Sequence, residues 1–207
     1  MTALPEPNLE TQSGLLWDIS FPDHLLSIAE YAALGETESG FTELVEGRLL
    51  MSPSPKARHN IASGNLFLQL GQQLPPELKA IQDIDVDLSL APVPEPGWSR
   101  RPDLIVVRRD AIERVDEENN LFRADEVLIV VEIVSPGSKR TDYVTKHGEY
   151  ADAGIPHYWI IDLADPISLV SCHQAGELGY QNAPAATGKF STTEPFPIEL
   201  DLERLRA

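Results

Sequence analysis

Two nearly continuous apolar runs dominate the hydrophobic pattern, one over residues 103–107 and one over residues 127–134. Strands that are apolar at every position are typical of a sheet covered on both faces, so both runs are predicted to be central strands. Two further strands are predicted over residues 157–162 and 167–173, and a last one around residues 196–200.

Helical spacing predicts three helices around these strands. Residues 22–35 suit a short amphipathic helix with Asp23 near its N-cap, and residues 141–153 suit a helix between two strands. A helix of roughly five turns is predicted over residues 56–74 and is ended by two prolines. Its candidate buried residues are Ile61, Leu66, Leu68 and Leu70.

Two stretches before residue 91 have the pattern of strands. Apolar residues flank Glu46 and Gly47, which predicts a β-hairpin over residues 41–51 with the glycine in its tight turn. Residues 83–90 alternate between apolar and mostly acidic positions, which is typical of a half-buried strand. The order of these elements predicts an α/β or α+β fold in which helices flank one mixed sheet.

Length and composition are those of an ordinary globular protein. The 207 residues are enough for one domain with a sizeable core, over residues 21–207, after a flexible tail at residues 1–20 that is rich in Pro, Glu, Thr and Ser. No apolar stretch is long enough to span a membrane and no secretory signal is recognisable, so a cytoplasmic location is expected. The only cysteine, Cys172, excludes an internal disulfide and a cysteine-based zinc site.

The formal net charge of −17 argues against a general nucleic-acid coat protein, because binding to phosphates needs clustered Lys and Arg. Contact with DNA would have to use local basic patches. The candidates are Arg100-Arg101, Arg108-Arg109 and Lys139-Arg140. For each pair taken alone, a solvated surface charge is the more ordinary interpretation.

Two acids stand where buried strands rarely carry one. Glu132 lies inside the apolar run 127–134, and Asp103 opens the run 103–107. An ionisable group in such a place is costly to bury unless it is paired or bound to a metal. Glu132 could instead pair with a buried Arg or Lys, and Asp103 could serve the turn after Pro102. Together, the two acids suggest a divalent-metal site.

These segments resemble the PD-(D/E)xK superfamily of restriction-endonuclease-like proteins. The resemblance rests on Pro102-Asp103, on Glu132 in the next predicted strand and on Lys146 in the helix after it. It extends from about residue 23 to about residue 200 and is greatest to a bacterial branch of uncharacterised predicted restriction endonucleases. The matching segments are Glu46-Gly47, Pro102-Asp103-Leu104, Val131-Glu132-Ile133-Val134-Ser135-Pro136, Asp142, Lys146, Tyr150 and Gly154-Ile155-Pro156-His157-Tyr158-Trp159-Ile160-Ile161-Asp162.

The resemblance implies a restriction-endonuclease-like mixed sheet flanked by helices, and a metal-dependent endonuclease that hydrolyses phosphodiester bonds in DNA. Asp103 and Glu132 would bind Mg²⁺ or Mn²⁺, and the backbone carbonyl of Ile133 would add a third oxygen. Lys146 would orient the attacking water or stabilise the phosphate. A homodimer is expected, because two sites related by a two-fold axis can cut both strands of a duplex.

One position departs from the superfamily's short motif. Val134 stands where a lysine is expected, and Lys146 is the best replacement. Asp142, four residues earlier, could hold Lys146 in place, while Glu46 and Tyr150 are candidates for the surrounding shell. The simpler interpretations are an exposed helix pair for Asp142 and Lys146, and an ordinary turn residue for Glu46.

Two other functions stay open at this point. The missing lysine and the strong negative charge favour a non-catalytic interaction protein that retains the nuclease fold. An acidic surface also tolerates a small substrate better than long DNA, which leaves a metal-dependent hydrolase of a small phosphorylated molecule. His59 could touch a substrate from the start of its helix, although a solvated or capping histidine is the ordinary interpretation.

Overall fold

The computed structural model describes residues 22–35, 40–52 and 54–206. The predicted tail, residues 1–20, lies outside the described residues, and the boundary of the single domain stays a prediction. Within the described ranges, no helix combines the length and the apolar character needed to cross a bilayer.

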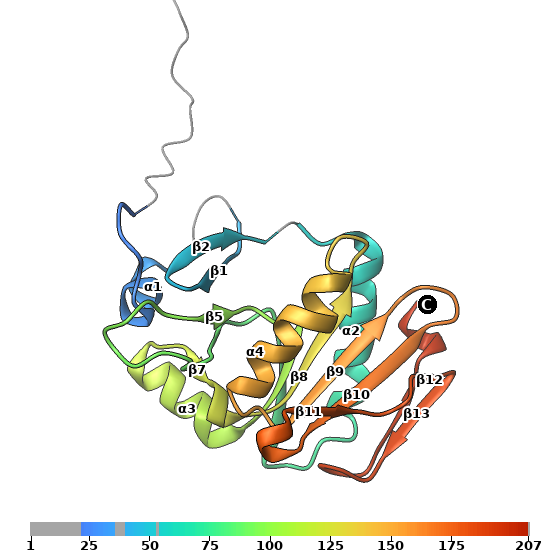
Figure 1. Ribbon diagram of the computed structural model, residues 1–207. Helices are drawn as coiled ribbons and strands as arrows, with labels where there is room; N and C mark the ends of the chain where they lie inside the picture. The colour runs from blue at the N-terminus through green and yellow to red at the C-terminus, as the bar shows by residue number, and fades with distance from the viewer. Residues whose placement is uncertain (1–21, 36–39, 53, 207) are drawn as a thin grey trace, which may run out of the picture.

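A mixed seven-stranded sheet forms the centre of the fold (Figure 1). Its strand order is β11-β10-β9-β8-β6-β3, with β12 paired to β10; β8 and β9 are parallel and the other pairs are antiparallel. The two apolar runs, predicted to be central strands, are neighbours in it. The strands are β3 (Leu78–Gln82), β6 (Leu104–Arg108), β8 (Val127–Val134), β9 (His157–Asp162), β10 (Ser168–Gln174), β11 (Tyr180–Asn182) and β12 (Ala186–Thr187).

Helices cover both faces of this sheet, α2 (Ala57–Gly71) behind it and α4 (His147–Asp152) in front of it in Figure 1. Because side chains alternate along a strand, β6 and β8 each bury one set against α2 and the other set on the side of α4. This explains why both strands are apolar at nearly every position. The remaining covering elements are α3 (Arg109–Glu118) on the α4 side, and β13 (Lys189–Thr192), β14 (Ile198–Asp201) and η4 (Glu203–Leu205) on the α2 side.

The predicted N-terminal hairpin is confirmed. β1 (Thr42–Val45) and β2 (Arg48–Met51) are antiparallel, and the two turn residues Glu46 and Gly47 have φ angles of 50° and 73°. Positive φ at both central positions is the requirement of the tightest hairpin turn. β1 and β2 belong to a five-stranded sheet with order β2-β1-β5-β4-β7. Its other strands are β4 (Val86–Asp87), β5 (Ser99–Arg100) and β7 (Phe122–Arg123).

The first helix begins later than predicted. α1 spans Ile28–Leu34, and its N-cap is Ser27 rather than Asp23. The Ser27 hydroxyl accepts a hydrogen bond from the backbone of Glu30, whose side chain accepts one from the backbone of Ser27. This reciprocal pair satisfies two donors at the helix start, which a lone Asp23 five residues upstream cannot do.

The long helix α2 is confirmed, but half of its predicted core is wrong. Leu66 and Leu70 are fully buried, whereas Ile61 and Leu68 are 49% and 59% exposed. Buried positions on α2 repeat every four residues from Ala62 to Leu70, so Ile61 and Leu68 lie on another side of the helix.

The predicted strand over residues 83–90 is also wrong, because the chain changes sheet inside it. β3 ends at Gln82, Asp83 takes a φ of 49°, and the chain forms a strand again only at Val86. The left-handed conformation of Asp83 redirects the backbone from the seven-stranded sheet into the five-stranded one. Alternation predicted burial, and Val86 and Leu88 are buried, but it carries no information on which sheet a segment joins.

Candidate active site

The two acids singled out in the sequence lie on the same face of the central sheet. Leu104 pairs with Val131, so the antiparallel register, continued by one residue, sets Asp103 opposite Glu132. Side chains of directly opposite residues project to the same face. Both acids therefore project to the α4 side, where β8 ends and β6 begins.

Asp103 is hydrogen-bonded to the end of β8. Its Oδ2 accepts a hydrogen bond of 2.6 Å from the backbone N–H of Ile133. His59 Nε2 lies 3.2 Å from that carboxylate oxygen and 3.1 Å from the carbonyl oxygen of Ile133. Because both oxygens can only accept, Nε2 carries a proton and donates it to both. The Asp103 carboxylate oxygen and the Ile133 carbonyl oxygen, both predicted metal ligands, therefore lie within hydrogen-bonding distance of the same atom, His59 Nε2.

His59 was not among the predicted site residues. It lies in the first turn of α2, and its Nδ1 is buried with no hydrogen-bond partner in the described part of the chain. The hydrogen bond to Asp103 raises the pKa of His59 above its ordinary value, although burial opposes the effect. His59 and Asp103 are 44 positions apart. The only signal in the sequence was a histidine at a helix start, which is too common to identify a site.

Glu132 is buried and hydrogen-bonded through one oxygen. Its Oε1 accepts bonds from Lys146 Nζ at 2.8 Å and from the Tyr150 hydroxyl at 2.7 Å. Within the described residues, no donor is bonded to Oε2. Burial raises the pKa of Glu132, the Lys146 ammonium opposes this, and the carboxylate of Asp103 raises the pKa further. The predicted acid, lysine and tyrosine therefore form one connected group.

Glu43 of β1 is a site residue that the sequence prediction did not include. Its Oε1 lies 3.1 Å from Lys146 Nζ, and its Oε2 accepts a bond of 2.8 Å from Arg100 Nη1. Arg100 also makes two bonds of 2.6 Å to Glu149. Burial acts to raise the pKa of Glu43, but Lys146 and Arg100 together hold it below its ordinary value. Glu43 is therefore ionised.

Lys146 lies between these two carboxylates. Burial disfavours its charge, but Glu132 and Glu43 outweigh burial and raise the pKa of Lys146 above its ordinary value. Because Glu43 is ionised, Lys146 keeps its proton whether or not Glu132 carries one. Lys146 is therefore a buried ammonium, suited to stabilising negative charge and unsuited to accepting a proton.

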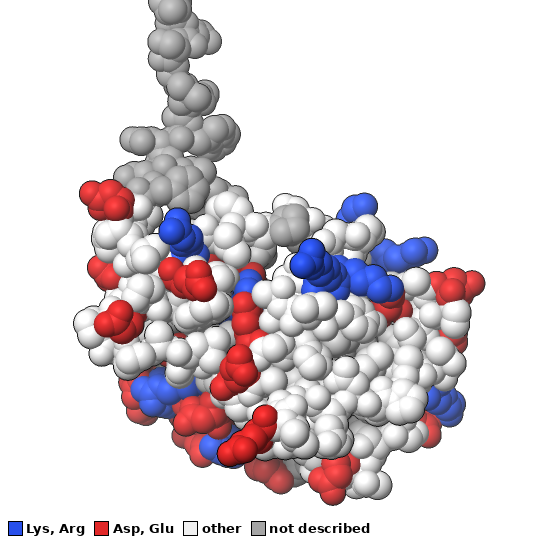
Figure 2. Space-filling model, in the orientation of Figure 1, with Lys and Arg blue, Asp and Glu red and all other residues white. Residues whose placement is uncertain are grey.

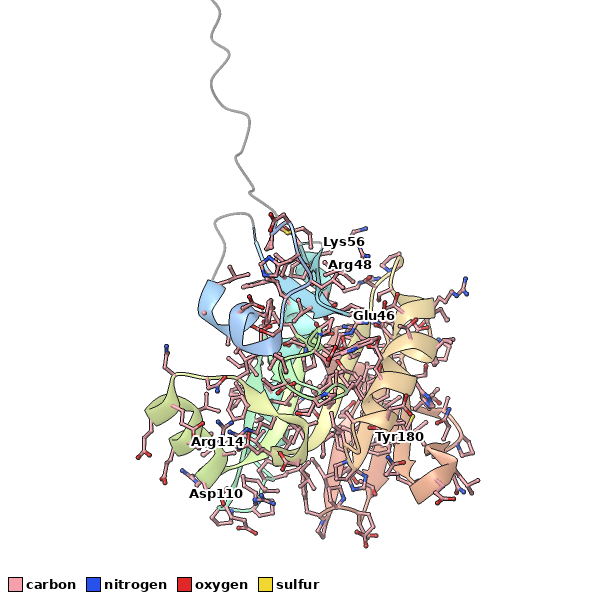
Figure 3. The ribbon with its side chains drawn as sticks, turned by 60° about the vertical axis from the view of Figure 1, so that its left-hand side comes forward. Glu46, Arg48, Lys56, Asp110, Arg114 and Tyr180 are labelled. Carbon is pink, nitrogen blue, oxygen red and sulfur yellow. The ribbon has the colours of Figure 1, made fainter. Side chains whose placement is uncertain are left out.

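Glu46, predicted as an outer ligand, lies in the exposed turn of the hairpin (Figure 3). Among the described residues, no hydrogen bond or ion pair connects Glu46 to the site. The acid that reaches the site from this hairpin is Glu43, three residues earlier. In the sequence, the only indication of Glu43 was that it is a charged residue among the strand-forming residues 41–45.

Asp142 and Lys146 both come from a π-helical turn, Thr141–Lys146, which leads into α4. Such turns are frequent at functional sites. Asp142 accepts a hydrogen bond of 2.5 Å from the Ser138 hydroxyl, and burial raises the pKa of Asp142. Glu132 and Glu43, rather than Asp142, are the residues that hold Lys146.

The oxygen atoms at this site suit a hard divalent cation. Carboxylate and carbonyl oxygens, as supplied by Asp103, Glu132 and Ile133, are the donors that Mg²⁺ and Mn²⁺ prefer. In residues 22–35, 40–52 and 54–206, no group of three or more His, Cys, Asp or Glu side chains is placed to hold a metal ion by itself. A partial shell is nevertheless the usual arrangement for Mg²⁺, which keeps several waters and binds substrate phosphates. The residues present therefore fit the ion.

A mixed sheet flanked by helices, with acids meeting at the end of its central strands, defines a protein of the restriction-endonuclease-like class. The chain belongs to the Uma2 family, described as “Putative restriction endonuclease”, whose model matches residues 28–204. No curated protein gives a significant match to the chain.

A solved structure supports the same fold. The chain is similar to the crystal structure of “a putative nuclease belonging to DUF820 from Anabaena variabilis ATCC 29413”, with a TM-score of 0.63 and 19% sequence identity. The match covers 87% of this chain and 97% of that chain. At this identity the likeness shows the fold alone, and it confirms the predicted fold class.

Proposed function

We propose that the protein is a metal-dependent endonuclease that hydrolyses phosphodiester bonds in DNA. Membership of the Uma2 family supports the nuclease class. The observation that carries the proposal is the meeting of Asp103 Oδ2 and the Ile133 carbonyl at one point, on the strand end that also carries Glu132. In this proposal these three residues hold one Mg²⁺ or Mn²⁺.

When bound, the ion would neutralise charge on the phosphate and supply an activated water. Lys146, held by Glu132 and Glu43, would stabilise the charge that builds up on the phosphate. Tyr150 keeps the Glu132 carboxylate oriented through its hydrogen bond. The ammonium that the superfamily's motif places two residues after the acid would here come from the helix, because Val134 occupies that position.

Nicking of supercoiled plasmid in Mg²⁺ or Mn²⁺ tests this function. We expect nicking by the wild type, none in a chelator, and none by Asp103→Asn or Glu132→Gln, which keep the side-chain shape but remove the charge. Asp116→Asn, which changes an exposed acid on α3, is the matched control and should cut as the wild type does. Cutting that survives both site substitutions would overturn the proposal. Turnover of a small phosphodiester without nicking would point to a small phosphorylated substrate instead.

The expected homodimer belongs to the same proposal, because paired sites could cut both strands of a duplex. Light scattering after size-exclusion chromatography, with and without a short duplex, measures the assembly. A dimer in either condition supports this part of the proposal, and a monomer in both conditions contradicts it.

The ion pairs at the site favour a second candidate, a non-catalytic interaction protein with the same fold. Lys146 and Arg100 already pair with Glu132 and Glu43, so each of these acids has a cationic partner without a metal. Calorimetric titration with Mg²⁺ and Mn²⁺ separates the candidates. Binding that Asp103→Asn abolishes supports the nuclease, and no binding of either ion supports the scaffold.

A further inference from the structure

Acidic residues are distributed unevenly along this chain. It has 33 Asp and Glu among 207 residues, yet residues 47–76 contain none. That stretch carries Arg48, Lys56 and Arg58. A second stretch without acids, residues 133–141, carries Lys139 and Arg140. We call these five cations the basic rim.

Four members of the basic rim border the candidate site on two sides. Lys56 is the N-cap of α2, and Arg58 immediately precedes His59, the residue that contacts the candidate ligands. Lys139 and Arg140 are the two helical residues that directly precede the π-helical turn, after the turn that follows β8. Each pair therefore lies next to a segment that contributes to the site, one beside His59 and the other before Asp142 and Lys146.

Arg48 lies on the third side, in the hairpin. Leu50 pairs with Glu43 across the two strands, and Arg48 is two residues from Leu50 on the same strand. Directly opposite residues, and residues two apart, share a face of a sheet. Arg48 is therefore on the hairpin face from which Glu43 reaches the site. Figure 3 shows Arg48 and Lys56 at the same end of the molecule.

The members of the basic rim are exposed, and most of them are unpaired. Arg48, Lys56, Arg58 and Arg140 make no ion pair within the part of the chain that the structure describes; these four positions are exposed. Lys139 contacts Asp162 at 2.9 Å, with its side chain 67% exposed. In a chain with 33 acidic and 16 basic residues, cations without a carboxylate partner are available to other anions.

The other basic pairs noted in the sequence are not available in this way. Arg100 and Arg101 are bonded to carboxylates of the protein, Arg100 to Glu43 and Glu149. Arg108 lies at the opposite end of β6 from Asp103. Figure 2 shows a group of Lys and Arg at the upper right of the molecule, where α2 and α4 begin, while along the lower edge basic residues are interleaved with acids.

We propose that the basic rim binds the phosphates of duplex DNA on both sides of the phosphate that enters the candidate site. The identity of the polymer rests on the proposed function. Contacts of this kind position a duplex without reading its sequence. The surrounding negative charge repels DNA elsewhere, so the rim would also orient it over the site.

The salt dependence of binding gives this proposal a magnitude. Each neutralised phosphate of duplex DNA contributes about −0.9 to the slope of log affinity against log salt, so five contacts give a slope of roughly −4.5. Between about 50 mM and about 200 mM salt, the affinity should then fall about 500-fold. With two contacts removed, the fall over the same range should be about 40-fold.

Fluorescence anisotropy of a labelled short duplex, with the full chain in a chelator to prevent hydrolysis, measures both slopes. The test variant is Lys56→Gln/Arg58→Gln. The control is Lys79→Gln/Arg204→Gln, which removes the same charge from two exposed cations that have no ion pair in the described ranges and lie outside the rim. We expect weaker binding and the shallower slope for the test variant only. Melting curves should match for all three proteins.

Three results would overturn the inference: no binding by the wild type, a wild-type slope in the test variant, or an equal loss in the control. The outcome is independent of the nuclease assay. Duplex binding through the rim without any nicking contradicts the proposed function but not the rim. Nicking by a protein whose binding ignores Lys56 and Arg58 contradicts the rim but not the function.

Discussion

Replacing Lys146 by Met tests how much the buried ammonium contributes to the stability of the site. Lys146 Nζ contacts Glu132 Oε1 at 2.8 Å and Glu43 Oε1 at 3.1 Å, and its side chain is only 10% exposed. Methionine fills a similar volume but provides no charge. The substitution therefore leaves Glu132 without its cation, while Glu43 retains Arg100.

The expected cost follows from the burial of the group. Removing one partner of a buried ion pair destabilises a protein by roughly 3–5 kcal/mol, because the other charge stays buried and unpaired. For a chain of this length, about 1 kcal/mol lowers the melting temperature by roughly 2–4 °C, so a fall of roughly 6–20 °C is expected. Lys139→Met is the matched control; its exposed pair with Asp162 should contribute no more than about 1 kcal/mol.

The loss of unfolding free energy in the Lys146→Met variant should depend on pH in a defined direction. Burial raises the pKa of Glu132, and the variant lacks the ammonium that opposes this. A carboxyl whose pKa is raised by folding contributes its stability below its unfolded pKa and loses it as the pH rises through its folded pKa. The destabilisation by Lys146→Met should therefore be smallest at acidic pH and should grow towards alkaline pH, because the pKa of Glu132 lies still higher in the variant than in the wild type.

Urea unfolding followed by circular dichroism, at several pH values, measures this free energy. The double variant Lys146→Met/Glu132→Gln should recover much of the loss, because the glutamine needs no cation. A loss below about 1 kcal/mol at high pH, or one that does not change with pH, would refute a buried charge pair at this position.

Three further substitutions test separate parts of the account. Tyr150→Phe removes one hydrogen bond to the Glu132 carboxylate and should lower the unfolding free energy by about 2 kcal/mol; an unchanged value would contradict that bond. His59→Ala should raise the affinity for Mn²⁺ about tenfold in calorimetry, because the imidazole no longer competes for two ligand oxygens, and an affinity equal to the wild type's would show that it is no competitor. Gly97→Ala places a Cβ 2.6 Å from the backbone nitrogen of Ile28 and should cost about 1–3 kcal/mol in thermal unfolding, which a wild-type melting curve would disprove.

The strands of the central sheet could be predicted from the sequence closely: 103–107 is observed as β6, Leu104–Arg108, one residue later. The predicted ranges 127–134 and 157–162 coincide with β8 and β9, because strands buried on both faces are apolar throughout and end where the apolar run ends. The prediction failed over residues 83–90, where the chain leaves one sheet for another at Asp83. Periodicity describes the faces of one element and does not reveal a change of partner strand.

The site was only partly predictable for a similar reason. Glu132 stands out because it interrupts an apolar strand, and Lys146 because it follows on the next helix; the two are 14 positions apart. Glu43 and His59 reach their partners Arg100 and Asp103 from 57 and 44 positions away. Contacts of that range arise from the packing of the hairpin and of α2 against the sheet end, which no local pattern encodes.

The most direct test of the central claim, that Asp103 and Glu132 share a single cation, is a calorimetric titration of the full chain with Mn²⁺. The account predicts one ion per chain for the wild type and for Asp116→Asn, and an affinity reduced at least about tenfold in both Asp103→Asn and Glu132→Gln. No binding by the wild type, or binding that neither site substitution weakens, would contradict it.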